Sequence, residues 1–236
     1  MKIEPLGDSA LIVRVVDEFA RDSEASLSTV LAALRALEAA SIPGVIELAP
    51  AYATVAAFFD PARVAPDEIA PTPFDSLRLR IESVLKSRSA NQESKSESAV
   101  MEVPVCYDGE FASDLAEVAR HAGLSEDEIV RRHSSASYRV HYIGFTPGFP
   151  FLSGLPPELA TPRRATPRKE IPAGAVAIGG AQTGIYPRKS PGGWNLIGRT
   201  PLRLFDLERE PPAFFQAGDH VRFRRISREE FDAFSR

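Results

Sequence analysis

Glycine and proline are concentrated in one stretch of this sequence, and they restrict its fold more than any other feature does. Residues 144–212 contain ten of the fifteen glycines and twelve of the twenty prolines. Proline breaks a helix interior and glycine weakens one, so this stretch cannot form long helices. We therefore predict short strands joined by tight turns, within a mostly β, closed or barrel-like domain that covers residues 100–236.

The chain before this domain follows a different pattern, in which strand-like and helix-like runs alternate. Apolar residues at helical spacing mark residues 26–40 and the stretch DSLRLRIESVL, which begins at Asp75. The runs typical of strands are residues 10–16, 45–48 and 54–59. We predict an α+β protein with a small N-terminal α/β domain over residues 1–86. Its element order is β-β-α-β-β-α if residues 2–6 also form a strand.

Residues 87–99, SRSANQESKSESA, separate the two domains. They contain no large apolar side chain and are rich in serine, glutamate and lysine, which predicts a linker. After this linker we predict two short helices from their capping residues. Ser113 precedes the first helix and Gly123 ends it, while Ser125 and Glu128 form a capping box for the second.

The sequence lacks the motifs of several common types of binding and catalytic site. Gly184 ends a stretch with the spacing of a P-loop, but Ile185 and Tyr186 replace the lysine and the serine or threonine that contact phosphate and magnesium. Neither G-x-G-x-x-G nor G-x-S-x-G occurs. The histidines are scattered without the i, i+4 spacing of a metal site, and we expect the helical ones, His121 and His133, at the surface.

Charge and cysteine content exclude further classes of protein. The net charge of -4 and the pI near 5.7 argue against a nucleic-acid binder, whose phosphate-contacting surface is basic. No stretch approaches the roughly 20 apolar residues of a membrane span, and the N-terminal sequence lacks a secretion signal. We expect a cytoplasmic protein without membrane contact. Cys106, the single cysteine, excludes an internal disulfide and a multi-thiolate metal site, and we expect it to be buried.

Two clusters of candidate functional residues lie in the glycine- and proline-rich part. The first, residues 138–156, interleaves aromatic residues with turn formers. Phe145, Phe149 and Phe151 are predicted to bind a partner or, alternatively, to form the core of the barrel. The second cluster belongs to a basic region, because the residues from 163 to 209 include nine lysines or arginines and three acids. This excess favours either a small anionic ligand or a solvated basic surface.

In the second cluster, polar side chains stand between glycines in the stretch GGAQTGIYPRKSPGGWNLIGRTP and in the residues before it. Arg168, Arg188 and Arg199 offer planar forks that suit carboxylate or phosphate, and Gln182 and Asn195 each donate and accept hydrogen bonds. Trp194 is either a lid over a ligand or the plug of the barrel. No nucleophile accompanies these residues, so the cluster favours a binding or orienting site, and no catalytic residue is assigned.

Long motifs in these clusters resemble a known family. They read IGFTPGFPFLSGL, ATPRRATPR and IPAGAVAIGGAQTGIYPRKSPGGWNLIGRTPLRLFD, and the amino end adds PLGDSALIVRV and GVIELAPAYATVAAFFDP. Over nearly its whole length except the linker, the sequence is similar to the family of the B subunits of 5-oxoprolinase. That family also contains the KipI-type kinase inhibitors and allophanate hydrolase subunit 1, and its members carry carboxyltransferase subdomains C and D.

The resemblance implies a cyclophilin-like β-barrel for the second domain and a function within a hetero-oligomer. The chain would belong to an ATP-dependent 5-oxoprolinase, which converts 5-oxo-L-proline to L-glutamate, and would act with a homologous C subunit together with a larger A subunit. It would be inactive alone, and ATP with Mg²⁺ would be bound by the complex and not necessarily by this chain. The substrate-binding residues expected around one shared cleft are Arg168, Gln182, Tyr186, Trp194, Asn195 and Arg199.

Two other functions stay open within the family. One is inhibition of a histidine kinase, with the aromatic cluster as the docking surface. The other is that of an allophanate hydrolase or urea carboxylase type of carboxyltransferase subunit, which acts with biotin. Kinase inhibition by the isolated chain would indicate the first, and biotin-dependent carboxylation by paired subunits would indicate the second.

Overall fold

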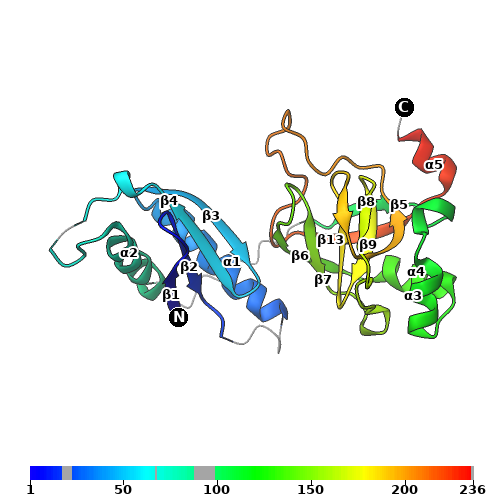
Figure 1. The fold of residues 1–236 in the computed structure, drawn as a ribbon, viewed down its shortest axis with the longest axis horizontal. Coiled ribbons are helices and arrows are strands. Elements are labelled where there is room, and N and C mark those ends of the chain that lie inside the picture. Colours follow the sequence, from blue (N-terminus) through cyan, green and yellow to red (C-terminus); the bar gives the residue numbers. More distant parts are fainter. Residues whose placement is uncertain (18–22, 67, 88–98, 235–236) are drawn as a thin grey trace. The chain divides into compact units, whose positions relative to one another are not determined.

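The computed structural model describes residues 1–17, 23–66, 68–87 and 99–234. The chain divides into two compact units, Met1–Glu97 and Ser98–Arg236 (Figure 1). The linker predicted over residues 87–99 falls almost wholly outside the described residues. Among the helices that are described, none combines the length and the apolar character needed to cross a bilayer.

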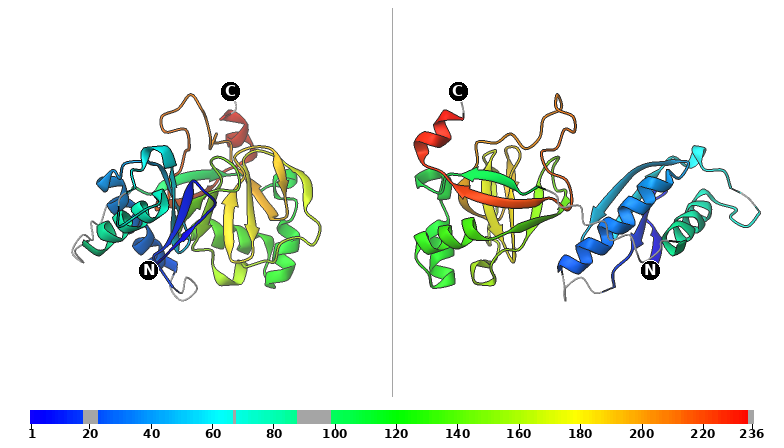
Figure 2. Two further views of the ribbon diagram at one scale, coloured as in Figure 1. Left: turned by 60° about the vertical axis from the view of Figure 1, so that its left-hand side comes forward. Right: turned by 180° about the vertical axis from the view of Figure 1, so that it is seen from behind.

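The residues described in the first unit form a four-stranded antiparallel sheet and two α-helices. The sheet has the order β1-β2-β4-β3. The elements in chain order are β1 (Lys2–Pro5), β2 (Ala10–Arg14), α1 (Ser23–Ala40), β3 (Val45–Ala51), β4 (Thr54–Phe59) and α2 (Pro73–Ser87), with a 3-10 turn at Pro61–Arg63. The order β-β-α-β-β-α is the one that the sequence pattern predicts. The right-hand view of Figure 2 shows α1 lying along the sheet.

The core of the first unit forms where the apolar stripes of both helices meet the sheet. Leu11 and Val13, two residues apart in β2, point to the same face of the strand and are fully buried. Val30 and Leu37 of α1 and Ile81 of α2 join them in one cluster. The helical spacing read from the sequence therefore marks the residues that hold this unit together.

The second unit is built around a seven-stranded sheet of order β12-β9-β10-β7-β6-β13-β5 (Figures 1 and 2). Its strands are β5 (Met101–Val105), β6 (Tyr138–Ile143), β7 (Pro150–Ser153), β9 (Ala175–Gly179), β10 (Gln182–Ile185), β12 (Asn195–Arg199) and β13 (His220–Arg225). A separate two-stranded sheet pairs β8 (Arg168–Ile171) with β11 (Ser190–Gly192). Neighbouring strands are antiparallel except β13 and β5, which are parallel.

A backbone bridge joins the two edges of the seven-stranded sheet. Cys106, which follows β5, exchanges two hydrogen bonds of 2.9 Å with Arg199, the last residue of β12. This bridge makes the sheet a nearly closed barrel, as predicted from the short runs between glycine and proline. Cys106 itself is fully buried, which also agrees with the prediction.

In the described part of the second unit, three α-helices accompany the barrel. They are α3 (Leu115–Ala122), α4 (Glu126–Ser135) and the C-terminal α5 (Arg228–Ala233), and 3-10 turns occur at Gly109–Ala112 and Pro157–Leu159. The helix α3 packs against β12 and against α4, which in turn packs against β13, so both helices lie together at one end of the barrel (Figure 1).

The caps of these helices follow the sequence prediction in part. The hydroxyl of Ser125 accepts the backbone N–H of Glu128 at 3.2 Å, which is one half of the predicted capping box, whereas the Glu128 carboxylate binds arginines of α4 instead of the Ser125 backbone. Gly123 ends α3 with a φ of 65°. The predicted cap Ser113 is wrong, because Asp114 occupies the N-cap position of α3. Ser113 has helical φ and ψ where the preceding 3-10 turn ends, so it cannot take the extended conformation of a typical N-cap.

His133 of α4 is fully buried, so its predicted surface position is wrong. Its Nδ1 lies 2.8 Å from the hydroxyl of Tyr107, and its Nε2 lies 3.0 Å from the hydroxyl of Thr183. The Thr183 hydroxyl donates to the carbonyl of Ala177 at 3.0 Å, so it accepts from Nε2–H and leaves Nδ1 to accept from Tyr107. Burial lowers the pKa of His133 to about 3, and the ring is neutral at physiological pH.

Candidate functional site

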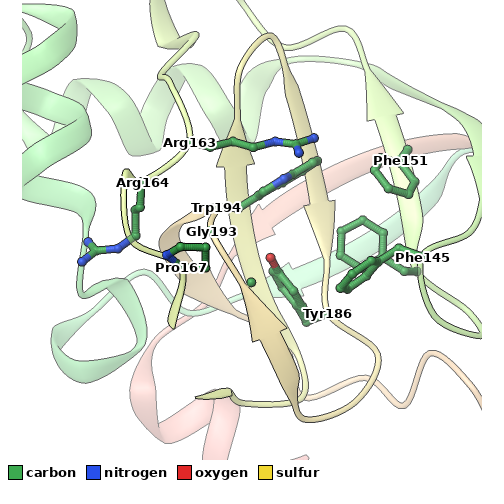
Figure 3. Close-up of a pocket in the computed structure, with 10 residues that line it drawn as sticks. Phe145, Phe151, Arg163, Arg164, Pro167, Tyr186, Gly193 and Trp194 are labelled. Atoms are coloured by element: carbon green, nitrogen blue, oxygen red, sulfur yellow. The ribbon is translucent and has the colours of Figure 1, made fainter. Parts of the chain in front are cut away.

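A cavity of about 230 Å³ opens among the glycine- and proline-rich strands of the barrel (Figure 3). We call it the aromatic pocket, because five aromatic side chains line it together with a loop that carries two arginines. The lining residues are Phe145, Phe149, Phe151, Arg163, Arg164, Pro167, Tyr186, Gly192, Gly193 and Trp194. Pockets for drug-sized ligands occupy about 300–1,000 Å³, so this one suits a smaller ligand.

Edge-to-face contacts fix the aromatic wall of this pocket. The ring of Phe149 lies 5.1 Å from that of Tyr186 and 5.7 Å from that of Trp194, centroid to centroid, at 85° and 88°. Phe151 lies 4.7 Å from Phe149 and 5.8 Å from Trp194. Aromatic pairs favour such geometry, and all four side chains are buried. Phe149 and Phe151 therefore belong to an apolar cluster of the barrel and to the pocket wall at once.

Two glycines make room for these rings. A Cβ atom on Gly179 would lie 2.5 Å from the ring of Trp194, and one on Gly192 would lie 2.4 Å from the hydroxyl oxygen of Tyr186. Such distances are far shorter than contacts in close-packed interiors, so any larger residue would displace the ring or the hydroxyl. Part of the glycine content that dominates this stretch is thus a requirement of the pocket.

Phe145 stands at the mouth of the aromatic pocket in a rare backbone conformation. It is 62% exposed and has a φ of 66°, in the left-handed region that bulky residues avoid. Its ring packs edge-on against Phe149 at 5.6 Å and Tyr186 at 6.4 Å. Strained residues of this kind cluster at binding sites, and a large exposed aromatic ring there is typical of a contact surface.

Asp114 holds the loop of residues 162–168 beside the pocket. Its buried carboxylate accepts hydrogen bonds from Nη1 of Arg164 at 2.9 Å and from Nη1 and Nη2 of Arg168, both at 2.7 Å. It also accepts the backbone N–H of Leu196 at 2.7 Å. Hydrogen bonds between ionised groups are the strong ones, so Asp114 fixes both arginines. Sequence reasoning missed this residue, because an acid at a helix start is typical of an ordinary cap.

Arg163 is the arginine of this loop that Asp114 does not bind. Its guanidinium carbon lies 5.6 Å from the centroid of the Trp194 ring. Figure 3 shows the Arg163 side chain extending alongside Trp194, whereas the Arg164 side chain points away from the other labelled residues. Among the described residues, Arg163 forms no ion pair within 4.0 Å.

A second cavity of the barrel, about 320 Å³, has four charged residues in its lining, and we call it the charged pocket. Its lining residues are Glu110, Phe111, Ser113, Arg168, Glu170, Pro172, Ala175, Leu196 and Arg199. Arg168 is bound by Asp114, as described above. Arg199 donates its Nε–H to the carbonyl of Ala173 at 2.9 Å and lies over the ring of Phe111 at 5.4 Å. With its arginines engaged and two glutamates in its lining, this pocket is poorly suited to an anion.

The structure does not bring the six predicted substrate-binding residues together. Tyr186 and Trp194 line the aromatic pocket, whereas Arg168 and Arg199 line the charged one. A strand rises about 3.3 Å per residue, so Trp194 before β12 and Arg199 at its end are separated by roughly 16 Å. Gln182, at the start of β10, lines neither pocket. These residues therefore do not line one cavity within this chain.

The side chain of Asn195 supports the fold and is not open to a ligand. Its side chain is 2% exposed and donates to the carbonyls of Pro162 at 2.9 Å and Ile178 at 3.3 Å. These two bonds use both amide hydrogens, and they tie the start of the arginine-bearing loop to β9 and β12. Asn195 thus supports the wall of the aromatic pocket from behind.

Tyr186 supplies the one hydroxyl among the residues that line the aromatic pocket. Burial raises the pKa of Tyr186, while a backbone hydrogen bond from Trp194 and the charges of Arg163 and Arg168 act in the opposite direction. The hydroxyl is therefore protonated at neutral pH and is able to donate a hydrogen bond. The lining contains no serine, cysteine, histidine or carboxylate, so the pocket is able to bind and orient a ligand but supplies no ordinary nucleophile.

The fold and the pocket define a class of protein, namely a two-unit chain whose barrel presents a small aromatic binding pocket without a nucleophile. A family model described as carboxyltransferase domain, subdomain C and D, matches residues 1–215. The chain belongs to this family.

Individual relatives narrow the similarity further. The B subunit of 5-oxoprolinase from Bacillus subtilis (strain 168) is 42% identical, over 99% of this chain and 96% of that protein. The B subunit of 5-oxoprolinase from Escherichia coli O157:H7 is 53% identical over 54% of this chain and 58% of that protein. The crystal structure of TTHA0988 matches with a TM-score of 0.75 and 37% identity, over 92% of this chain and 40% of that longer chain.

Proposed function

We propose that this chain is the B subunit of an ATP-dependent 5-oxoprolinase, which opens the lactam ring of 5-oxo-L-proline to give L-glutamate. The observation that carries the proposal is the 42% identity to the B subunit of Bacillus subtilis, which extends over almost the entire length of both proteins. The small size of the aromatic pocket agrees with a substrate that has a single five-membered ring.

The part of this chain in the reaction is to bind and orient the substrate. A lactam carbonyl is a weak electrophile, and negative charge develops on its oxygen during attack. The protonated hydroxyl of Tyr186 is a donor suited to that oxygen, and the buried rings around it exclude water. We assign substrate contact to Tyr186 and Trp194, and we assign support of the pocket wall to Asn195 and Arg168.

We assign ATP to the complex and not to this chain. Ile185 and Tyr186 stand where a P-loop places its phosphate contacts. In the part of the chain that the structure describes, no three histidine, cysteine or acidic side chains are grouped closely enough to hold a metal ion. We therefore place no contact with ATP on the residues of this chain.

The proposed partners are a homologous C subunit together with a larger A subunit. This chain matches only 40% of the longer TTHA0988 chain. That match supports a function for which this chain needs further protein segments, here supplied by partner subunits. We also assign the barrel to the cyclophilin-like type, and we assign Phe145, exposed at the pocket mouth, to the contact with a partner. Phe149 and Phe151 are buried, so a partner would reach them only through the pocket.

Reconstitution tests this function. The chain is purified with the products of the adjacent reading frames, and release of ADP and of glutamate is measured together. We expect hydrolysis of ATP that depends on 5-oxo-L-proline and is coupled to glutamate formation, and we expect its loss when this chain is omitted. Full activity without this chain would contradict the proposal. Biotin-dependent carboxylation, or inhibition of a histidine kinase by the chain alone, would assign one of the other two functions of the family.

A further inference from the structure

We propose that the aromatic pocket binds a small, flat ring acid through its carboxylate, and that Arg163 is the residue that selects for this charge. The class of ligand follows from the pocket. That the acid is 5-oxo-L-proline rests on the proposed function. Arg163 was absent from the residues that the sequence singled out for substrate binding.

The charge available to a ligand in this pocket is that of Arg163. Asp114 engages the guanidinium groups of Arg164 and Arg168 with three hydrogen bonds of 2.7–2.9 Å. Arg163 lies beside Trp194 instead, and the lining contains no carboxylate that would neutralise it. A guanidinium presents two parallel N–H groups that match the two oxygens of a carboxylate. An entering anion therefore meets an arginine without an ion-pair partner among the described residues.

The other walls select for a small ring. The cavity of about 230 Å³ is smaller than the roughly 300–1,000 Å³ of pockets for drug-sized ligands. The ring of Phe149 stands nearly perpendicular to the rings of Tyr186 and Trp194, which favours a flat ligand that packs against one face and one edge. The hydroxyl of Tyr186 lies within the same lining and is able to donate to a carbonyl of the ring. A ring that carries both a carbonyl and a carboxylate uses all of these groups.

Trp194 allows a direct test, because it is the only tryptophan of the chain and lies in the pocket wall. The full chain is titrated with 5-oxo-L-proline, with cyclopentanecarboxylate and with 2-pyrrolidinone, which has the lactam ring but no carboxylate. Intrinsic fluorescence reports occupancy, and calorimetry gives the affinities independently. We expect both acids to bind, and we expect 2-pyrrolidinone to bind at least about tenfold more weakly than 5-oxo-L-proline, since it has no carboxylate to form a bidentate ion pair with the guanidinium.

Two variants identify the selecting residue. In Arg163→Gln, we expect the affinity for both acids to fall about tenfold or more while that for 2-pyrrolidinone stays the same. The matched control is Arg188→Gln, which removes an exposed arginine that lines neither pocket and should leave all three affinities unchanged. Equal binding of 2-pyrrolidinone and 5-oxo-L-proline, or wild-type acid binding by Arg163→Gln, would overturn the proposal. If the chain alone binds none of the three, the assembled complex is titrated in the same way, and absence of acid binding there overturns it too.

The outcomes separate this inference from the proposed function. If the complex is active and Arg163→Gln does not change its KM for 5-oxo-L-proline, the proposed function holds and the role of Arg163 is excluded. If the chain binds ring acids through Arg163 but never supports turnover of 5-oxo-L-proline, the proposed ligand class holds and the proposed function is excluded.

Discussion

The aromatic pocket and the charged pocket differ in what holds Arg163 in the first and Arg168 and Arg199 in the second. In the charged pocket, Arg168 is bound by the carboxylate of Asp114, and Arg199 is held by a backbone carbonyl and by the ring of Phe111. In the aromatic pocket, Arg163 has an aromatic ring beside it and no carboxylate within 4.0 Å among the described residues. An arginine bound by a carboxylate, such as Arg168, supports the fold, whereas Arg163, whose guanidinium forms no hydrogen bond or ion pair among the described residues, is able to bind a ligand. The number of arginines in a basic stretch therefore does not locate an anion site.

Removing the carboxylate of Asp114 should have the largest effect, because it releases both engaged arginines at once. Asp114→Asn is expected to lower the free energy of unfolding by about 3 kcal/mol, in the range for breaking a buried ion pair. Urea unfolding followed by circular dichroism measures this loss. Asp108→Asn removes a half-exposed carboxylate 3.6 Å from Arg225 and should cost less than about 1 kcal/mol. Equal losses in the two variants would contradict the role given to Asp114.

Adding a single methyl group behind Trp194 should damage the aromatic pocket and spare the charged one. In Gly179→Ala the new Cβ would lie 2.5 Å from the indole ring, so Trp194 must move, at a cost of about 1–3 kcal/mol. We expect the binding of ring acids to be lost. Gly193→Ala is the matched control for stability, because its Cβ would meet no atom closer than 3.7 Å. Thermal unfolding and calorimetric titration distinguish the two variants, and similar melting temperatures would argue against close packing at Gly179.

The barrel interior should respond to pH through His133. The pKa of this ring is about 3 in the folded chain and near 6.5 in the unfolded one, so between these values the unfolded chain binds one more proton. The stability that the neutral His133 ring contributes to the folded chain is fully present above pH 6.5. It is lost as the pH falls toward 3, by up to about 1.4 kcal/mol per pH unit. Unfolding curves across this range measure the slope. His133→Gln should flatten the slope, and an unchanged slope would assign it to other groups.

The smallest expected effect is that of Arg199→Gln. The variant loses the stacking on Phe111 and Phe231, which is worth about 0.5–1 kcal/mol at exposed sites, and leaves the aromatic pocket intact. A small fall in melting temperature with unchanged affinity for 5-oxo-L-proline is the expected result. Weaker binding of that acid would instead restore the substrate contact that the sequence predicted for Arg199.

His133 shows which structural features can be predicted from a sequence pattern. Ile129 and Val130 lie four and three residues before it, on the same face of α4, and both are buried. That spacing placed His133 on the apolar side of the helix, so the information was present in the sequence and was outweighed by the polar nature of the residue. The position of Asn195 had no such signal, because its partners at residues 162 and 178 are distant in sequence.

The sequence by itself determined the local structure and the family of this protein. Periodicity placed the elements of the first unit, glycine and proline enforced the short strands of the barrel, and the long motifs carried the resemblance. Only the tertiary structure decided which side chains meet. Asp114 and Arg164 are 50 residues apart and come together because α3 packs on β12 beside the loop that carries the arginines. Long-range pairing of this kind depends on which elements are neighbours in space, and that order is not encoded in any local pattern. Because Asp114 binds Arg164 and Arg168, Arg163 is the arginine of this loop that is left to bind a ligand.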